Sequence, residues 1–256
     1  MPTYDATTAF GADARVERDF LRQVFAWMFL ALALTTGVAI WFHGHSTLAW
    51  VSAHPTLFYV ALFAQLAFVF ALRYVLVSQR VSAQVAAFMF FVYAALTGAV
   101  FSILLDVYTT DSVIGAFAGA CGVFAGMALL GYTTRTDLSR FGPILFGALI
   151  GMVVASVVFI FTGGQTLNLI IGFVGVIVFS GLTAYDIQML KQLRAGGSVS
   201  TRFGGMGGRG GMGGGRQLSL ADGASAEKLA ILGALWLYLD FINLFISLLR
   251  IFGNSR

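Results

Sequence analysis

The sequence predicts an all-α integral membrane protein, organised as a bundle of seven transmembrane helices. Hydrophobic residues make up 59% of the 256-residue chain and charged residues only 10%, whereas soluble globular domains carry about 25% charged residues. The mean hydropathy is +0.88. The apolar residues form continuous runs of roughly 20, the length that crosses a bilayer as a helix. Such runs exclude a membrane β-barrel, whose strands alternate in polarity over about ten residues.

Seven segments have the length and composition of a transmembrane helix. The polar residues 1–22 precede them, include several acids unlike the basic start of a signal peptide, and form the expected N-terminal tail. The membrane domain then covers 23–252, includes a Gly-rich loop at 195–216, and leaves a C-terminal tail at 253–256. The expected spans are 23–42, 57–77, 83–105, 112–132, 142–162, 167–187 and 229–252.

The basic residues orient this layout. The N-terminal tail and the second, fourth and sixth loops hold twelve of the 15 Lys and Arg residues, while the first, third and fifth loops hold none. Cytoplasmic loops are enriched in these residues. We therefore expect a cytoplasmic N-terminus and, after seven crossings, an external C-terminus; a re-entrant seventh segment is the alternative, because Arg250 and Arg256 lie at that end. The twelve are Arg15, Arg18, Arg22, Arg80, Arg135, Arg140, Lys191, Arg194, Arg202, Arg209, Arg216 and Lys228.

Glycine is used in two ways along the chain. Gly-xxx-Gly patterns at 115–119, 122–126 and 147–151 predict close helix packing within the bundle. The sixth loop has eleven glycines between 196 and 215, which predicts a flexible coil. This loop matches no phosphate-binding motif. We expect a linker rather than an RNA contact, no nucleic-acid partner, and arginines that can rest on anionic lipid.

Two acidic residues fall inside apolar spans. Asp186 lies near the end of the sixth span and Asp240 near the middle of the seventh. A carboxylate at the centre of a membrane helix costs about 2.5–3.5 kcal/mol on insertion scales, so such residues face a partner, a cavity or an ion path. Counted from Lys228 and Arg194 at 1.5 Å per residue, both acids lie in the cytoplasmic half. Spacing alone does not establish that they meet.

Arg73 and a polar stripe are the next candidates. Arg73, in the second span, lies at the level of Asp186 and either pairs with an acid or extends its side chain to the interface. Asp240, Asn243, Ser247 and Arg250 are spaced by three or four residues and form one stripe on the seventh helix. The stripe faces the bundle interior or water, or it forms a seam of interhelical hydrogen bonds.

Two neighbouring carboxylates in a poorly hydrated site cannot both ionise cheaply, so they titrate as a unit. Carboxylate oxygens also attract hard cations, which makes Asp186 and Asp240 candidate transient ligands for a cation. Asp106 and Asp111 lie in a short external loop, where they are solvated or form a cation-attracting mouth. We expect no bound cofactor. From the residues alone, the transported species is a proton or a cation.

The chain closely resembles the Bax inhibitor-1 family, also called the transmembrane Bax-inhibitor-motif family, and looks like a bacterial member. The resemblance is carried by GALWLYLDFINLF at 233–245 with Leu-Leu-Arg at 248–250, by GLTAYDIQ at 181–188, and by YTTRTDLS at 132–139. With the seven-helix layout, it covers nearly the whole chain.

The resemblance implies a pH-sensitive calcium leak in the bacterial inner membrane, with Asp186 and Asp240 as the proton sensor. Our hypothesis is that an Asp186–Arg73 latch and a proton shared by the two acids hold a central seventh helix across the path. Protonation loosens the latch, although the sign of the pH response reverses if lost carboxylate charge matters more for cation entry.

Two other classes of function remain open. Tyr185-Asp186 and a second acid on the next helix are reminiscent of intramembrane aspartyl proteases, but the Gly-x-Gly-Asp motif of those enzymes is replaced here by Leu-Tyr-Leu-Asp at 237–240. We therefore expect no enzymatic activity. The alternative class is a membrane partner that modulates a protease or a stress-response pathway without conducting ions.

Overall fold

The computed structural model describes the backbone of residues 6–43, 53–77, 81–194, 199–200, 217–218 and 226–254. Within these ranges the chain forms seven long helices, one 3-10 turn and one pair of two-residue strands that lie antiparallel. The helices are α1 (Ala6–His43), α3 (Pro55–Val77), α4 (Ala83–Val107), α5 (Thr110–Thr133), α6 (Gly142–Thr162), α7 (Gln165–Arg194) and α8 (Ala226–Phe252); the shorter elements are η1 (Ser139–Phe141), β1 (Val199–Ser200) and β2 (Gln217–Leu218).

Every expected span coincides with a long helix, so the prediction of an all-α membrane protein is confirmed. Six of the helices are long and apolar enough to cross a bilayer, whereas the described residues of α3 give a shorter apolar stretch, Leu62–Leu72. Seven crossings therefore stay a prediction. Two helices extend well beyond the expected spans: α1 begins at Ala6, within the expected tail, and α7 continues to Arg194. Hydropathy identifies only the apolar part of a helix, so it does not predict the polar turns that continue the helix beyond that part.

Local signals fix several helix ends. The side chains of Ser82 and Thr109 accept hydrogen bonds from backbone N–H groups in the first turns of α4 and α5, which satisfies donors that the helix itself leaves unpaired. Pro143 stands in the first turn of α6, where no backbone N–H is needed. At the other end, Gly163 and Gly164 adopt positive φ values of 63° and 101°. This conformation favours glycine and turns the chain directly into α7.

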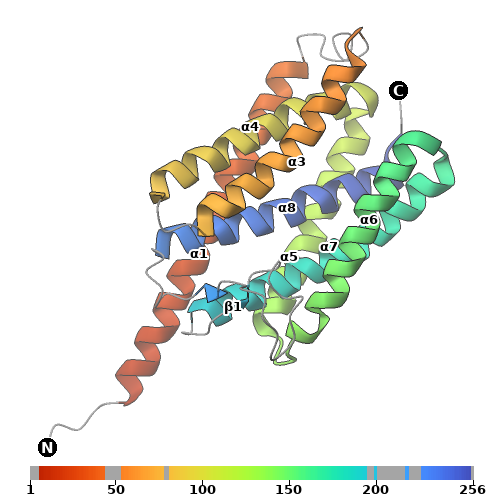
Figure 1. Ribbon diagram of the computed structural model, residues 1–256. Coiled ribbons are helices and arrows are strands. Elements are labelled where there is room, and N and C mark those ends of the chain that lie inside the picture. The colour runs from red at the N-terminus through yellow and green to blue at the C-terminus, as the bar shows by residue number, and fades with distance from the viewer. Residues whose placement is uncertain are drawn as a thin grey trace, which may run out of the picture.

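Helix α8 is the most buried of the candidate spans. In its most apolar stretch 83% of the residues are buried, against 0–44% in the other five. Figure 1 shows α8 crossing the middle of the molecule, with α3 and α4 on one side and α6 and α7 on the other. Contacts join α8 to α1, α3, α4, α5 and α7. Helix α8 therefore contributes more buried residues to the core than any other candidate span.

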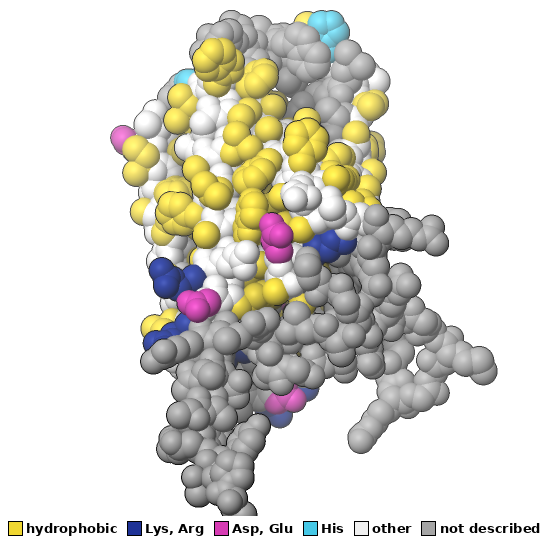
Figure 2. Space-filling model, turned by 90° about the vertical axis from the view of Figure 1, so that its left-hand side faces the viewer, with side chains coloured by type: hydrophobic (Ala, Val, Ile, Leu, Met, Phe, Trp, Pro, Cys, Tyr) yellow, Lys and Arg dark blue, Asp and Glu magenta, His cyan; other side chains and the backbone are white. Residues whose placement is uncertain are grey.

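The outer surface of the bundle is apolar. None of the most apolar stretch of α6 is buried, and side chains such as Phe161 (84% exposed) and Ile177 (71%) point outward. Figure 2 shows hydrophobic side chains covering much of one face, with most of its charged side chains toward the lower half. A surface of this kind is stable in contact with lipid rather than water.

The predicted role of the Gly-xxx-Gly patterns is wrong at most positions. In the ranges 115–119, 122–126 and 147–151, an added Cβ would meet a neighbour only at Gly119, at an ordinary contact distance of 3.4 Å from Leu248. Closer approaches occur elsewhere, as at Gly98 in α4, where a Cβ would lie 2.8 Å from the Val38 Cβ of α1. The spacing puts glycines on one face, but helix rotation decides whether that face meets another helix or lipid.

Gly98 provides a test of the packing between α1 and α4. We expect Gly98→Ala to destabilise the protein by about 1–3 kcal/mol, because the new methyl group overpacks the α1–α4 contact. The matched change Gly122→Ala adds a methyl into open space and should leave stability equal or raise it by up to about 1 kcal/mol. Thermal unfolding of both variants in detergent measures the difference. Equal midpoints would contradict the α1–α4 packing described here.

Candidate functional site

The two acids predicted from the sequence are both buried in the bundle. Asp186 of α7 is 2% exposed and Asp240 of α8 is 1% exposed. Both side chains interact with their surroundings. A carboxylate held this deeply in a membrane protein is energetically costly unless the protein satisfies it, which is the usual sign of a functional position.

The packing of α7 against α8 fixes the levels of the two acids. A Cβ added at Gly175 of α7 would meet Ser247 of α8, and one added at Gly233 of α8 would meet Leu190 of α7. The helices are therefore antiparallel, and counting inward from either contact puts Asp186 level with residues 236–237. Asp240 lies three or four residues further along α8, about 5 Å at 1.5 Å per residue.

The same contacts fix the faces on which the acids lie. Asp240 follows Gly233 by seven residues and precedes Ser247 by seven, nearly two full turns each, so the three share one side of α8. Asp186 precedes Leu190 by four residues and follows Gly175 by eleven, which are both close to whole turns of α7. The two acids thus lie on the surfaces through which α7 and α8 contact each other, one helical turn apart.

Arg73 belongs to α3, which contacts both α4 and α8. Its side chain lies outside the described residues. The latch between Arg73 and Asp186 therefore stays a prediction.

Two members of the polar stripe of α8 make hydrogen bonds within their own helix. The Asn243 side-chain amide donates to the Leu239 carbonyl at 2.7 Å, and the Ser247 hydroxyl donates to the Asn243 carbonyl at 2.7 Å. Ser247 also packs against Gly175 of α7. Ser247 therefore faces the bundle interior, and these two hydrogen bonds do not cross between helices.

The opposite side of α8 carries a buried hydroxyl layer that the sequence did not reveal. The Tyr238 hydroxyl lies 2.7 Å from the Thr35 hydroxyl of α1, which itself donates to backbone carbonyls. The Tyr238 ring packs edge-on against Phe90 and Tyr93 of α4, with centroids 5.7 and 6.1 Å away. Tyr238 is fully buried. The one sign of this layer in the sequence is a threonine within an apolar helix, and threonines are too common in such helices to predict it.

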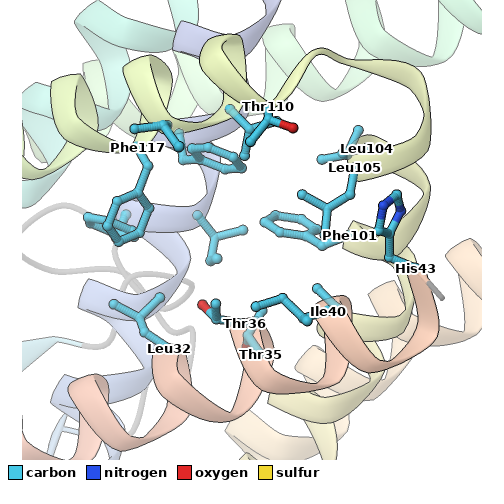
Figure 3. A pocket seen from close by; sticks show the side chains of 16 residues that line it. Leu32, Thr35, Thr36, Ile40, His43, Phe101, Leu104, Leu105, Thr110 and Phe117 are labelled. Carbon is cyan, nitrogen blue, oxygen red and sulfur yellow. The ribbon is translucent and has the colours of Figure 1, made fainter.

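Beyond this layer lies a cavity of about 420 Å³ between α1, α4, α5 and α8. Figure 3 shows side chains of α1 and α5 forming opposite walls, with Thr35 beside Leu32 and Thr36 on the α1 wall and His43 toward the end of α1. Apart from His43 and three threonines, the lining is hydrocarbon and aromatic.

Asp106 does not lie in a solvated loop as expected. It belongs to the last turn of α4, is 16% exposed, and its Oδ1 lies 2.6 Å from His43 Nδ1 at the end of α1. The sequence pattern missed this ion pair because the two residues are 63 positions apart. Asp111, by contrast, is exposed in the first turn of α5.

The helix segment that holds Asp186 is also tied to the loop between α5 and η1. The Gln188 side chain accepts a hydrogen bond from Leu138 N at 2.7 Å and donates one to the Thr136 carbonyl at 2.8 Å. Within the loop, the Ser139 hydroxyl and its backbone N–H lower the pKa of the exposed Asp137 carboxyl. The loop motif at 132–139 is thus a structural partner of the motif at 181–188.

Among the described residues, no group of three or more His, Cys, Asp or Glu side chains is arranged to hold a metal ion. The assignment of Asp186 and Asp240 as transient calcium ligands remains a prediction.

The fold and these positions define a multi-pass helical membrane protein with two acids buried between its last two helices. A family model described as inhibitor of apoptosis-promoting Bax1 matches residues 17–256. The chain belongs to the Bax inhibitor-1 family, so the resemblance seen in the sequence is confirmed.

Bacterial relatives match over almost their whole length. Inner membrane protein YbhL of Escherichia coli K12 is 41% identical over 239 residues, which cover 93% of this chain and 92% of the relative. A protein of Deinococcus radiodurans is 42% identical over 239 residues, 93% of this chain and 91% of its own. A protein of Borreliella burgdorferi is 31% identical over 242 residues, 94% of each chain.

The Gln188 contacts lead to a direct test. We expect Gln188→Leu to speed amide exchange in residues 134–138, because it removes two hydrogen bonds worth about 0.5–1.5 kcal/mol each. The control is Gln192→Leu, one turn further along α7, where the side chain is exposed. Hydrogen–deuterium exchange with peptide mass spectrometry measures both. Equal exchange in the two variants would show that Gln188 does not hold the loop.

Proposed function

We propose that this protein is a pH-sensitive calcium leak of the bacterial inner membrane, with Asp186 and Asp240 as its proton sensor. The observation that carries the proposal is the burial of both carboxylates on the facing surfaces of α7 and α8, one turn apart. Membership of the Bax inhibitor-1 family and the inner-membrane name of the E. coli relative support it. Calcium is the transported ion, and the protein has neither a bound cofactor nor an enzymatic activity.

The proton sensor works through charge. Each pH unit on either side of a titration midpoint changes the ratio of protonated to ionised forms about tenfold, and two acids this close titrate as a coupled unit. When Asp186 is ionised, it holds Arg73 and keeps α8 in place. Protonation removes that negative charge, so the latch loosens and the leak rate rises as the pH falls.

The structure corresponds to the closed state in this proposal. Tyr238, Thr35, Phe90 and Tyr93 fill the space between α8, α1 and α4 without polar lining for a hydrated ion. The cavity beyond them is apolar, and apolar constrictions block ions by excluding water. Opening therefore requires α8 to move relative to α1 and α4, which a change of charge on its other face can drive.

The arrangement in the membrane is part of the same proposal. All seven long helices cross the bilayer, the N-terminus is cytoplasmic, and α8 is the central helix. The Asp106–His43 pair then lies at the external mouth, where Asp106 contributes negative charge near the entrance. Solvated Asp111 adds to it.

Calcium flux into proteoliposomes tests the sensor. With the full chain reconstituted around a calcium dye, wild-type flux should rise several-fold between pH 8 and pH 5, and Asp240→Asn and Asp186→Asn should each flatten the response. An amide cannot lose or gain the proton, which is the physical reason for the flattening. Asp19→Asn is the matched control, because its carboxylate is exposed on the N-terminal part of α1, and it should keep the wild-type profile.

Absence of flux at every pH, with the protein shown to be folded, would refute the leak and favour the role of a membrane partner. Flux that falls as the pH falls would keep the sensor but reject the latch.

Reporter fusions test the topology. A fluorescent protein that folds only in the cytoplasm should be bright at the N-terminus, and alkaline phosphatase, active only outside the cytoplasm, should be active when fused after Arg256. The two termini lie on opposite sides of the membrane when the number of crossings is odd. A cytoplasmic C-terminus would mean that one long helix does not cross, and α3 or a re-entrant α8 would be the segment to examine.

A further inference from the structure

The proposed leak assigns no ligand to the cavity between α1, α4, α5 and α8, whose lining is almost entirely apolar. Its volume of about 420 Å³ is within the range of ligand-binding pockets, about 300–1,000 Å³. An engineered apolar cavity of about 150 Å³ stays dry and binds benzene, so this one has room for a molecule with more than twice as many carbon atoms. A space of this size and composition is suited to hydrocarbon.

The cavity is continuous with the lipid-facing surface. Ile40 of α1 and Ile114 of α5 line it and are 63% and 61% exposed. They stand on the two helices that form its opposite walls, as seen for Ile40 in Figure 3. The next residue, Trp41, is also a large apolar side chain and is 70% exposed. In a membrane, the medium at this opening is therefore the acyl-chain region of the bilayer.

The rim of the cavity has the opposite character. His43 is the last residue of α1 and Asp106 stands in the last turn of α4, and their side chains form an ion pair at 2.6 Å. Polar groups at the ends of membrane helices lie at the level of lipid headgroups. The site thus has a charged end at the interface and an apolar interior below it, the same order of polarity as a phospholipid.

We propose that this cavity binds one acyl chain of a phospholipid, which enters between α1 and α5 from the leaflet at the His43 end. The chain lies against Phe101 of α4 and against Ile242 and Phe245 of α8, and the headgroup remains near His43 and Asp106. Binding of an acyl chain here does not require calcium conduction, so this inference is tested separately from the proposed function. The bound acyl chain contacts α8, the helix that carries Asp240, inside the bundle.

Photolabelling of the reconstituted full chain tests the site. The probe is a phosphatidylcholine with a diazirine near the end of one acyl chain, present in trace amounts in phosphatidylcholine vesicles. Phe241, Ile242 and Phe245 are only 4–7% exposed, so bulk lipid does not reach them and only a chain inside the cavity labels them. Peptide mass spectrometry should find label in residues 241–245, as well as on outward-facing Phe161.

A filled cavity provides the matched comparison. Val113→Trp places an indole in the cavity from α5 and should lower labelling of 241–245 several-fold relative to Phe161. Val153→Trp makes the same change on α6, at a side chain that is 44% exposed and outside the cavity, and should leave the ratio unchanged. Thr36→Phe fills the cavity from the α1 wall and provides a second variant if Val113→Trp does not fold.

Three results would overturn the proposal. Label confined to outward-facing residues would show that no chain enters, and label at 241–245 that both filling variants leave unchanged would show entry by another route. Label from a photoreactive free fatty acid but not from the phospholipid would identify a different amphiphile as the occupant.

Discussion

The burial of α8 is the constraint on which the rest of the structure depends. A membrane-spanning helix with a carboxylate at its middle is unstable in lipid and becomes stable only when protein surrounds it. Asp240 is 1% exposed because five other helices contact α8 and leave most of its surface without lipid contact. Helix α6 is the opposite case: it is apolar and exposed, so it is stable in direct contact with lipid. The helices α1, α3, α4, α5 and α7 together cover the last helix.

The two sides of α8 have different chemistry. The side toward α7 carries Asp240, opposite the surface of α7 that holds Asp186. The side toward α1 and α4 carries Tyr238, whose hydroxyl bonds to Thr35 and whose ring packs on aromatic neighbours. The acidic side and the aromatic side therefore belong to one continuous helix. In the leak that we propose, a movement of α8 caused by protonation at the acidic side would also move the aromatic side.

Small residues decide which helices approach closely. Helices in a membrane gain little from the hydrophobic effect, so packing relies on close contact between backbones. Gly175 and Gly233 allow α7 and α8 to meet around the acids, and Gly131 of α5 leaves room for Ala184 of α7, two residues before Asp186. Where no such approach occurs, between α1 and α5, a cavity remains. Small residues thus explain both features: they allow close contact around the acids, and a cavity remains near the end of α1 where they do not bring helices together.

The sequence by itself determined the helices, the two intramembrane acids and the family, because hydropathy and motif identity are local properties of the chain. It also identified Asp186 and Asp240 as buried positions, since a carboxylate in an apolar span has few alternatives. Tertiary structure alone decided the register of α7 against α8, the His43–Asp106 pair, the Gln188 contacts and the cavity. Those features depend on how each helix is rotated about its axis, which the Gly-xxx-Gly spacings predicted wrongly. Rotation is fixed by the neighbouring helices, and no single segment encodes it.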